Sequence, residues 1–357
     1  MPAIRARPPG RYLKIQEVPI LRIGVIGFGY WGPNLVRNFA EAKGGKVVAM
    51  ADLSAQKCTA FERRYPGIRT TTDPRELINA ADVDAVVIAT PVRTHFELAF
   101  AAIEAGKHVM VEKPMTETVE QALRLVDAAA RRGVTLMVDH TFVYTGAVRK
   151  IRSLVESGEL GDVYYYDSTR INLGLFQHDV DVIWDLAVHD LAILDYVVGE
   201  KATAVSATGM AHIPGHVENV AYLTAYMGSG MIAHVNVNWL SPVKIRHTMV
   251  GGSRKMVVYD DLEPSEKLKI YDKGITLTDD PERISQMLVG YRTGDMLAPQ
   301  IVGREALAVE AEHFIDCVTN SKTPITDGAC GLRIVELCEA ATKSMKMRGH
   351  PVEIVSR

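Results

Sequence analysis

The chain of 357 residues contains only four cysteines, and no two of them stand at Cys-x-x-Cys spacing. No histidine cluster accompanies them at the spacing of a zinc site, so we predict no metal centre. We interpret Cys58, Cys317, Cys330 and Cys338 as reduced packing residues of a cytoplasmic protein. No run approaches the ~20 apolar residues that a membrane span needs. Lys and Arg total 40 and Asp and Glu total 43, and the resulting net charge of −3 argues against a generally basic nucleic-acid-binding protein.

The first twenty residues also lack the apolar core of a secretory signal. They are basic and contain Pro2, Pro8, Pro9 and Pro19. We therefore expect residues 1–20 to form an N-terminal arm outside the folded domains.

The length of the chain predicts two domains. In residues 21–141, short apolar runs without polar alternation are separated by helical patterns, which is typical of a doubly wound α/β domain with a buried parallel sheet. In residues 142–357, longer runs alternate polar and apolar side chains between amphipathic helices. This second pattern predicts an α+β domain with a mainly antiparallel sheet, and the family resemblance given below implies that this domain binds the substrate and mediates oligomerisation.

A glycine-rich loop follows the first apolar run. Its sequence is Gly27-Phe28-Gly29-Tyr30-Trp31-Gly32, and Pro33 stands next, where a helix is expected to begin. In such a loop the first glycine permits a tight turn, the second lets a pyrophosphate approach the backbone, and the third lets the helix pack closely. We expect all six residues to help bind a dinucleotide at the helix N-terminus.

Asp52 ends the second apolar run, 20 residues after Gly32. A carboxylate at this place accepts hydrogen bonds from the adenosine ribose and repels a 2′-phosphate. NAD is therefore the expected cofactor, although Lys57 leaves NADP open as an alternative.

Two further strand ends carry polar residues. Thr90 and Pro91 close one run and are expected to line the nicotinamide ribose site, whereas His95 either joins them or is a solvated histidine at a helix start. Glu112 and Lys113 close the next run, and Glu112 is expected at the cofactor. Lys113 is either a surface lysine or an amine held over the cleft.

Asp185 and His189 are four residues apart in an apolar-patterned helix, so they are expected to share one face. A carboxylate beside an imidazole raises its basicity and fixes its orientation, and such a pair can abstract a proton from a hydroxyl group. An ordinary surface ion pair has the same spacing, and the spacing alone does not choose between them.

Taken together, the loop at 27–32, Asp52, the Glu-Lys-Pro at 112–114 and the helix at 185–189 resemble the Gfo/Idh/MocA oxidoreductase family. The family is named for glucose–fructose oxidoreductase and inositol dehydrogenase, and the resemblance extends from Leu21 to the C-terminus. It implies a Rossmann domain, a C-terminal domain with a large open antiparallel sheet, and assembly into homodimers or homotetramers. The implied reaction is NAD(P)-dependent oxidation or reduction at a sugar or cyclitol carbinol.

The resemblance also implies roles for three residues. Lys113 polarises or orients the reacting oxygen. His189 is the general base in oxidation and the acid in reduction. Asp185 orients His189 and holds a neighbouring substrate hydroxyl.

Residues 139–151, 170–190 and 238–261 resemble a narrower branch whose members act on nucleotide-linked or amino sugars, often at C3 of a UDP-hexose. Where that branch often has glycine before the histidine, this chain has Asp139, which adds a charge near Tyr144. The candidates for sugar hydroxyls are Tyr144, Arg170, Asn172, Gln177 and His178. Lys244 and Arg246 are expected on one sheet face, where they meet either a diphosphate or solvent.

Other functions remain open on the same scaffold. They are a free-sugar or inositol dehydrogenase, a hydrolase or lyase that uses NAD transiently, and a non-catalytic NAD-binding regulator. The segment 276–299 is expected either to cover the cleft or to reach a neighbouring subunit.

Overall fold

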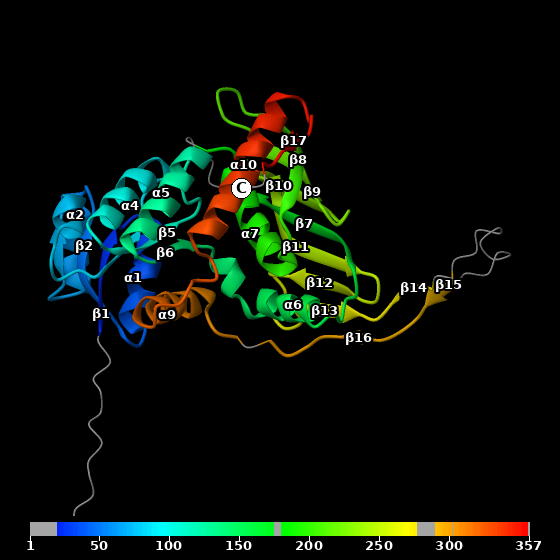
Figure 1. Ribbon diagram of the computed structural model, residues 1–357, viewed down its shortest axis with the longest axis horizontal. Coiled ribbons are helices and arrows are strands. Elements are labelled where there is room, and N and C mark those ends of the chain that lie inside the picture. The colour runs from blue at the N-terminus through cyan, green and yellow to red at the C-terminus, as the bar shows by residue number, and fades with distance from the viewer. Residues whose placement is uncertain (1–19, 175–179, 277–289, 302, 356–357) are drawn as a thin grey trace, which may run out of the picture.

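A computed structural model of the chain describes residues 20–174, 180–276, 290–301 and 303–355. Two sheets stand side by side, with helices between them and around the first (Figure 1). The expected arm, His178 and part of the segment 276–299 lie outside the described residues.

The first sheet is parallel and six-stranded, in the order β3-β2-β1-β4-β5-β6. Its strands are β1 (Leu21–Ile26), β2 (Gly45–Ala51), β3 (Arg69–Thr71), β4 (Ala85–Ile88), β5 (His108–Glu112) and β6 (Leu136–Asp139). The connecting helices are α1 (Gly32–Glu41), α2 (Ala55–Arg64), α3 (Pro74–Ile78), η1 (Val92–Thr94), α4 (His95–Glu104) and α5 (Val119–Arg132). The strand order reverses between β1 and β4, and such a reversal opens a ligand crevice at the carboxyl ends of the strands.

The second sheet has nine strands in the order β16-β13-β12-β11-β7-β10-β9-β8-β17. Its strands are β7 (Val163–Leu173), β8 (Ala202–Met210), β9 (Val220–Met227), β10 (Ile232–Asn238), β11 (Leu240–Gly252), β12 (Met256–Asp260), β13 (Leu268–Tyr271), β16 (Met296–Leu297) and β17 (Val352–Glu353). All neighbouring pairs are antiparallel except β7 and β10. The predicted fold class, an α/β chain with a doubly wound parallel sheet and a mainly antiparallel second sheet, is confirmed.

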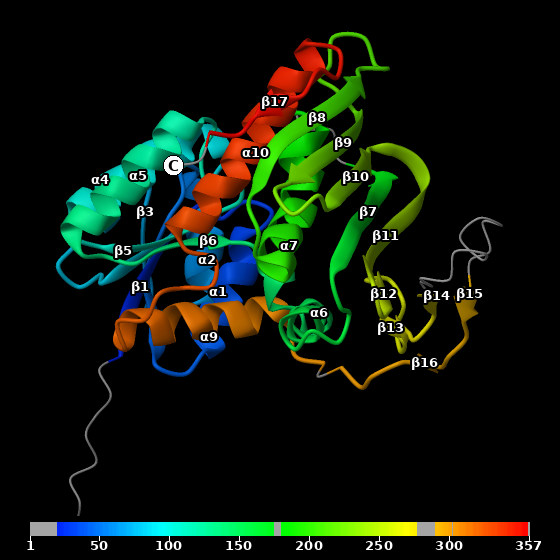
Figure 2. The same cartoon turned by 45° about the vertical axis from the view of Figure 1, so that its right-hand side comes forward.

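Helices cover one face of the second sheet (Figure 2). They are η2 (Thr141–Tyr144), α6 (Gly146–Glu156), the π-helical turn η3 (Ile183–Ala187), α7 (Val188–Val198) and α10 (Gly328–Lys346). The other face is open, and Tyr165, Tyr222, Tyr226 and Ile232 are exposed on it. A small hairpin of β14 (Gly274–Thr276) and β15 (Gly290–Arg292) projects beyond this sheet, on the side away from the parallel sheet (Figures 1 and 2).

Two helices from the end of the chain return to the first sheet. The ring of Phe314 in α9 (Ala306–Thr319) packs edge-on against Phe39 of α1, and Arg37 forms a bidentate ion pair with Glu305. The amide of Val138 in β6 donates to the carbonyl of Thr326, just before α10. The range 142–357 therefore supplies part of the packing of the nucleotide-binding domain as well as the second sheet.

Among the described residues, no helix has both the length and the apolar character needed to cross a membrane.

Candidate active site

A cavity of about 910 Å³ follows the carboxyl ends of β1, β2, β4 and β5. This is the edge at which open parallel sheets bind ligands. The predicted site residues that line it are Gly27, Gly29, Tyr30, Trp31, Asp52, Thr90, Pro91, Glu112 and Lys113. The structure thus brings together residues from four separate strand ends.

The three glycines of the loop fit a bound dinucleotide. Gly27 has a φ of +99°, which favours glycine, and a Cβ there would lie 2.5 Å from the Ala89 carbonyl oxygen. A Cβ on Gly32 would lie 2.2 Å from the carbonyl oxygen of Gly27, so the helix start packs tightly under the loop. A Cβ on Gly29 would meet no protein atom within 4 Å, so this backbone is bare toward the cavity.

Asp52 is fixed at the mouth of this loop. Its carboxylate accepts hydrogen bonds from the backbone N–H groups of Phe28 at 2.8 Å and Ser54 at 2.9 Å, and from Lys57 Nζ at 3.2 Å. Burial alone would raise the pKa of Asp52, but these donors outweigh it and lower the pKa. The carboxylate is therefore ionised and oriented, as ribose recognition requires. Phe28 takes part through its amide, while its ring packs against Phe61.

His95 is neither solvated nor open to the cavity, so both expectations for it need correction. It is 1% exposed, with Nδ1 2.9 Å from the Pro114 carbonyl oxygen and Nε2 2.7 Å from that of Thr90. Burial lowers its pKa in spite of the two carbonyls. His95 thus links the end of β4 to the segment after β5, and it supports the cavity wall through its contacts with Thr90 and Pro114.

Lys113 leaves the end of β5 and reaches the second half of the chain. Its Nζ donates to the backbone carbonyl of Asp185 at 2.8 Å and lies 3.2 Å from Asp185 Oδ1. Both side chains are about four-fifths buried. Lys113 is therefore an amine held over the cleft rather than a free surface lysine.

The expected Asp185–His189 pair is not formed. Residues Ile183–Ala187 make a π-helical turn, with backbone hydrogen bonds that span five residues. The Asp185 carboxylate pairs instead with Lys113 and accepts a hydrogen bond from Trp239 Nε1 at 3.0 Å. Nδ1 of His189 is buried and has no hydrogen-bond partner in the described part of the chain.

The surroundings of His189 keep its imidazole neutral. The ring packs edge-on against Phe142, with centroids 4.9 Å apart. Burial, followed by the positive charges of Lys113 and Arg170, holds the pKa of His189 well below its usual value. A neutral imidazole next to a buried ammonium can accept a proton from a hydroxyl group that the ammonium polarises.

Two of the predicted sugar-binding residues have structural roles instead. Tyr144 is 2% exposed, and its hydroxyl lies 3.2 Å from Thr326 Oγ1. Arg170 is 3% exposed and donates to the Asp190 carboxylate at 2.6 and 3.2 Å. Because Asp190 belongs to α7, this buried ion pair joins the helix of His189 to strand β7. Sequence patterns could not distinguish an arginine that faces a sugar from one that faces the core.

The other substrate candidates lie at the edge of the second sheet. Asn172 is half-buried near the end of β7, and Lys244 is exposed on β11. Arg246 forms an ion pair with Asp261 at 3.1 Å and lies with Arg170 over the ring of Phe142. Arg246 therefore already carries a counterion, which weakens the expectation that it meets a diphosphate.

The contact of Trp239 with Asp185 was not among the sequence predictions. Trp239 is fully buried at the bend between β10 and β11, and it holds Asp185 from the side opposite Lys113. A buried indole N–H needs an acceptor, so a tryptophan in an apolar run of the second domain was an available signal.

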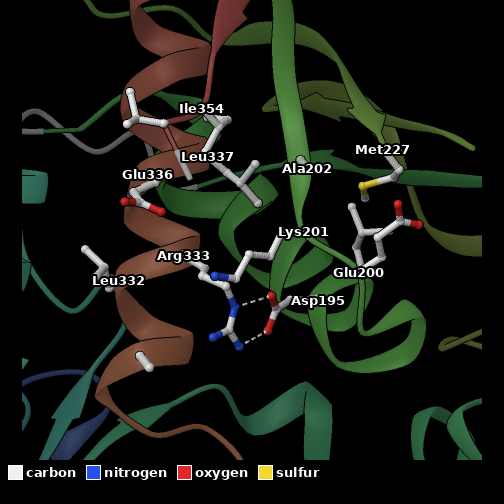
Figure 3. A pocket seen from close by; sticks show the side chains of 13 residues that line it. Asp195, Glu200, Lys201, Ala202, Met227, Leu332, Arg333, Glu336, Leu337 and Ile354 are labelled. Carbon is white, nitrogen blue, oxygen red and sulfur yellow. Dashed lines mark hydrogen bonds and ion pairs between the residues drawn. The ribbon is translucent and has the colours of Figure 1, made fainter. Parts of the chain in front are cut away.

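A second cavity of about 240 Å³ lies between α7, β8 and α10, and it contains none of the predicted site residues. Figure 3 shows Arg333 of α10 reaching Asp195 of α7 on its wall, with two hydrogen bonds of 2.7 Å.

Family models match both halves of the chain. The oxidoreductase family model of Gfo/Idh/MocA, an NAD-binding Rossmann fold, matches residues 21–140, and the Gfo/Idh/MocA C-terminal domain model matches residues 148–258.

Individual relatives match over most of the chain. The NAD(+)-dependent scyllo-inositol 2-dehydrogenase of Bacillus subtilis is 25% identical over 94% of this chain and 96% of its own length. The UDP-N-acetylglucosamine 3-dehydrogenase of Acidithiobacillus ferrooxidans is 28% identical over 88% of this chain and 94% of its own length. A solved structure of that dehydrogenase superposes with a TM-score of 0.78 at 24% identity and covers 92% of this chain and 98% of its own, which shows the shared fold.

Proposed function

Because the chain belongs to the Gfo/Idh/MocA oxidoreductase family, and so is an NAD-dependent enzyme acting on CH–OH groups of sugars or polyols, we propose that it oxidises a ring carbinol of a nucleotide-linked hexose. The observation that carries the proposed chemistry is the buried Lys113–Asp185 pair beside the neutral His189. Similarity to a UDP-N-acetylglucosamine 3-dehydrogenase over most of the chain supports the substrate class.

In this proposal the cofactor is held by the loop of Gly27–Gly32, by Asp52 at the ribose, and by the cavity wall at Thr90, Pro91 and Glu112. When bound, NAD supplies the nicotinamide that accepts a hydride. Lys113 binds the reacting oxygen and stabilises the negative charge that grows on it. His189 takes the hydroxyl proton in oxidation and returns it in reduction. Asp185 acts by holding Lys113, with Trp239 holding Asp185 in turn.

The exposed ammonium of Lys244 supports a nucleotide-linked substrate. Within the described ranges it has no ion-pair partner, in contrast to Arg246. A free cation on β11 can meet a phosphate group. The second candidate is an inositol or free sugar, which the similarity to scyllo-inositol 2-dehydrogenase favours.

A single-turnover absorbance assay for NADH distinguishes these substrates. The protein is mixed with stoichiometric NAD, and separately NADP, and then with UDP-N-acetylglucosamine, UDP-glucose, glucose or inositols. We expect NADH with a UDP-hexose, and we expect Lys244→Ala to weaken that reaction alone. NADH with inositols or free sugars only would contradict the nucleotide-sugar assignment. Product formed from a glycoside without net NADH would favour the hydrolase or lyase.

The Asp52→Ala variant tests the preference for NAD. We expect it to weaken NAD binding about tenfold, because one oriented carboxylate that accepts ribose hydroxyls is lost. NADP binding should weaken less or improve, since the charge that repels the 2′-phosphate is removed while Lys57 remains. Titration of the variant with both cofactors by fluorescence measures this. An equal loss for NAD and NADP would show that Asp52 does not contact the ribose.

We also propose that copies of the chain associate through the open face of the nine-stranded sheet. Tyr165, Tyr226 and Ile232 form one cross-strand row there, and all three are exposed. Exposed apolar patches of this kind mark interaction surfaces. Light scattering during size-exclusion chromatography tests this, and a monomer at micromolar concentration would exclude it.

A further inference from the structure

Three carboxyl groups meet between the cofactor cavity and helix α9, and we call them the carboxyl cluster. Glu112 stands at the end of β5, Asp139 at the end of β6 and Glu310 in α9. Asp139 lies opposite Glu112 in the pairing of β5 with β6, and its charge acts on both glutamates. Asp139 is 2% exposed and Glu310 is fully buried. Three neighbouring carboxylates cannot all stay ionised at such a place.

Two side-chain hydrogen-bond donors of the carboxyl cluster reach Asp139. Asp139 accepts hydrogen bonds from Trp31 Nε1 at 3.0 Å and from the Thr141 hydroxyl at 2.5 Å. Neither carboxyl oxygen of Glu310 has a donor partner among the described residues. Burial, together with the neighbouring Asp139, raises the pKa of both Glu112 and Glu310 well above the usual value. Burial and the neighbouring carboxylate therefore favour the protonated forms of Glu112 and Glu310, whereas Trp31 and Thr141 both donate to Asp139.

The single carboxylate of Asp139 connects two walls of the cofactor cavity. On one side it holds the indole of Trp31, which lines the cavity from the glycine loop. On the other side it lies opposite Glu112 in the pairing of β5 with β6, and Glu112 lines the cavity and accepts a hydrogen bond from the amide of Lys113 at 2.9 Å. Glu310 backs the arrangement from α9, so the C-terminal part of the chain takes part in it.

We propose that Asp139 is a positioning residue for the cofactor, which holds Trp31 and the Glu112–Lys113 segment in the geometry that accepts NAD. The proposal rests on the cofactor cavity described above and is independent of the sugar that the enzyme oxidises.

Direct NAD titration without sugar tests this, using energy transfer from tryptophan to NADH. We expect Asp139→Asn to weaken NAD and NADH binding about tenfold. An asparagine amide has an N–H donor in place of one carboxylate oxygen, so it cannot accept hydrogen bonds from both Trp31 and Thr141. Trp31→Phe removes the indole donor but keeps a ring, and it should cause a similar loss. In the double variant the two losses should not add, since both variants break the same contact. In steady state the effect should appear in KM for NAD more than in kcat.

Two further variants separate positioning from general stability. Asp195→Asn also removes a buried carboxylate, the partner of Arg333 in Figure 3, and it should lower the melting temperature without weakening NAD binding. Glu310 does not line the cofactor cavity, so Glu310→Gln should weaken NAD binding less than Asp139→Asn does.

Wild-type NAD affinity in a folded Asp139→Asn variant would overturn the proposal, and so would losses that add in the double variant. If Asp139→Asn does not fold, Trp31→Phe decides alone, and unchanged NAD affinity there overturns the proposal. A wild-type protein that binds NAD but oxidises no sugar would contradict the proposed substrate only.

Discussion

Replacing His189 with asparagine is expected to lower turnover by about 10²- to 10⁴-fold, the usual contribution of a general base. Burial and the nearby Lys113 and Arg170 hold the pKa of His189 well below its usual value, so the wild-type imidazole is neutral and ready to accept a proton. Asparagine cannot take a proton. NAD titration should be unchanged, because His189 is not among the residues that line the cofactor cavity.

The pH profile gives a second test of the same residue. Because the pKa of His189 is lowered, kcat/KM for oxidation should stay flat as the pH falls through about 6.5, the usual histidine value. The value of kcat/KM should decline only at lower pH, where His189 becomes protonated in the folded protein. An acidic limb centred at the ordinary histidine pKa would contradict the assignment.

Protein stability should change in the pH range in which kcat/KM stays flat, because the same lowered histidine pKa values affect folding. The pKa of His140 is lowered to about 4 by burial, and that of His189 is also lowered. In the unfolded chain a histidine has a pKa of about 6.5. Below that pH the unfolded chain binds protons at these histidines that the folded chain does not bind. The free energy of unfolding should therefore fall as the pH drops from about 6.5 toward 4.

His350→Asn, at an exposed histidine, is a matched control for the turnover measurement on His189→Asn and should retain wild-type activity.

Replacing Lys113 with methionine is expected to have a comparable effect, a loss of about 10²- to 10³-fold in turnover. Methionine keeps much of the length of the side chain but removes the ammonium that stabilises charge on the reacting oxygen. It also leaves the mostly buried Asp185 carboxylate with Trp239 as a remaining donor. Binding of NAD should change little, so the loss should appear in kcat and not in KM for NAD.

Lys107→Met is the matched control for this prediction. Lys107 also belongs to the first domain, and its Nζ donates to the carbonyls of Ala80 and Val83 at 2.8 and 2.7 Å. Its loss should lower stability and leave turnover per folded molecule unchanged. If Lys113→Met retained turnover within a few-fold of wild type, Lys113 would have no direct part in the reaction.

The cofactor side of the site could be predicted because its signals are local. The glycines at 27, 29 and 32 and the carboxylate of Asp52 follow strand ends directly, and the parallel sheet brings strand ends to one edge. The same reasoning places Thr90, Glu112 and Lys113 at that edge. These residues needed only the order of strands and helices, which the apolar pattern already indicated.

The substrate side depended on contacts that no local pattern encodes. The Asp185 carboxylate contacts Lys113 and Trp239, so the expected pair with His189 is not formed. Arg170 and Tyr144 are polar in the sequence, but Asp190 and Thr326 satisfy them inside the core. Each of these outcomes depends on a partner far away in the sequence, which pattern analysis does not identify.

The return of α9 and α10 to the parallel sheet has a consequence for how the protein is made. Phe39 of α1 and the amide of Val138 find their partners, Phe314 and Thr326, only near the end of the chain. When synthesis has reached residue 141, every strand of the parallel sheet has been made, but the helices α9 and α10 that pack against its domain have not. The nucleotide-binding half of the nascent chain therefore stays incompletely packed until α9 and α10 have emerged from the ribosome.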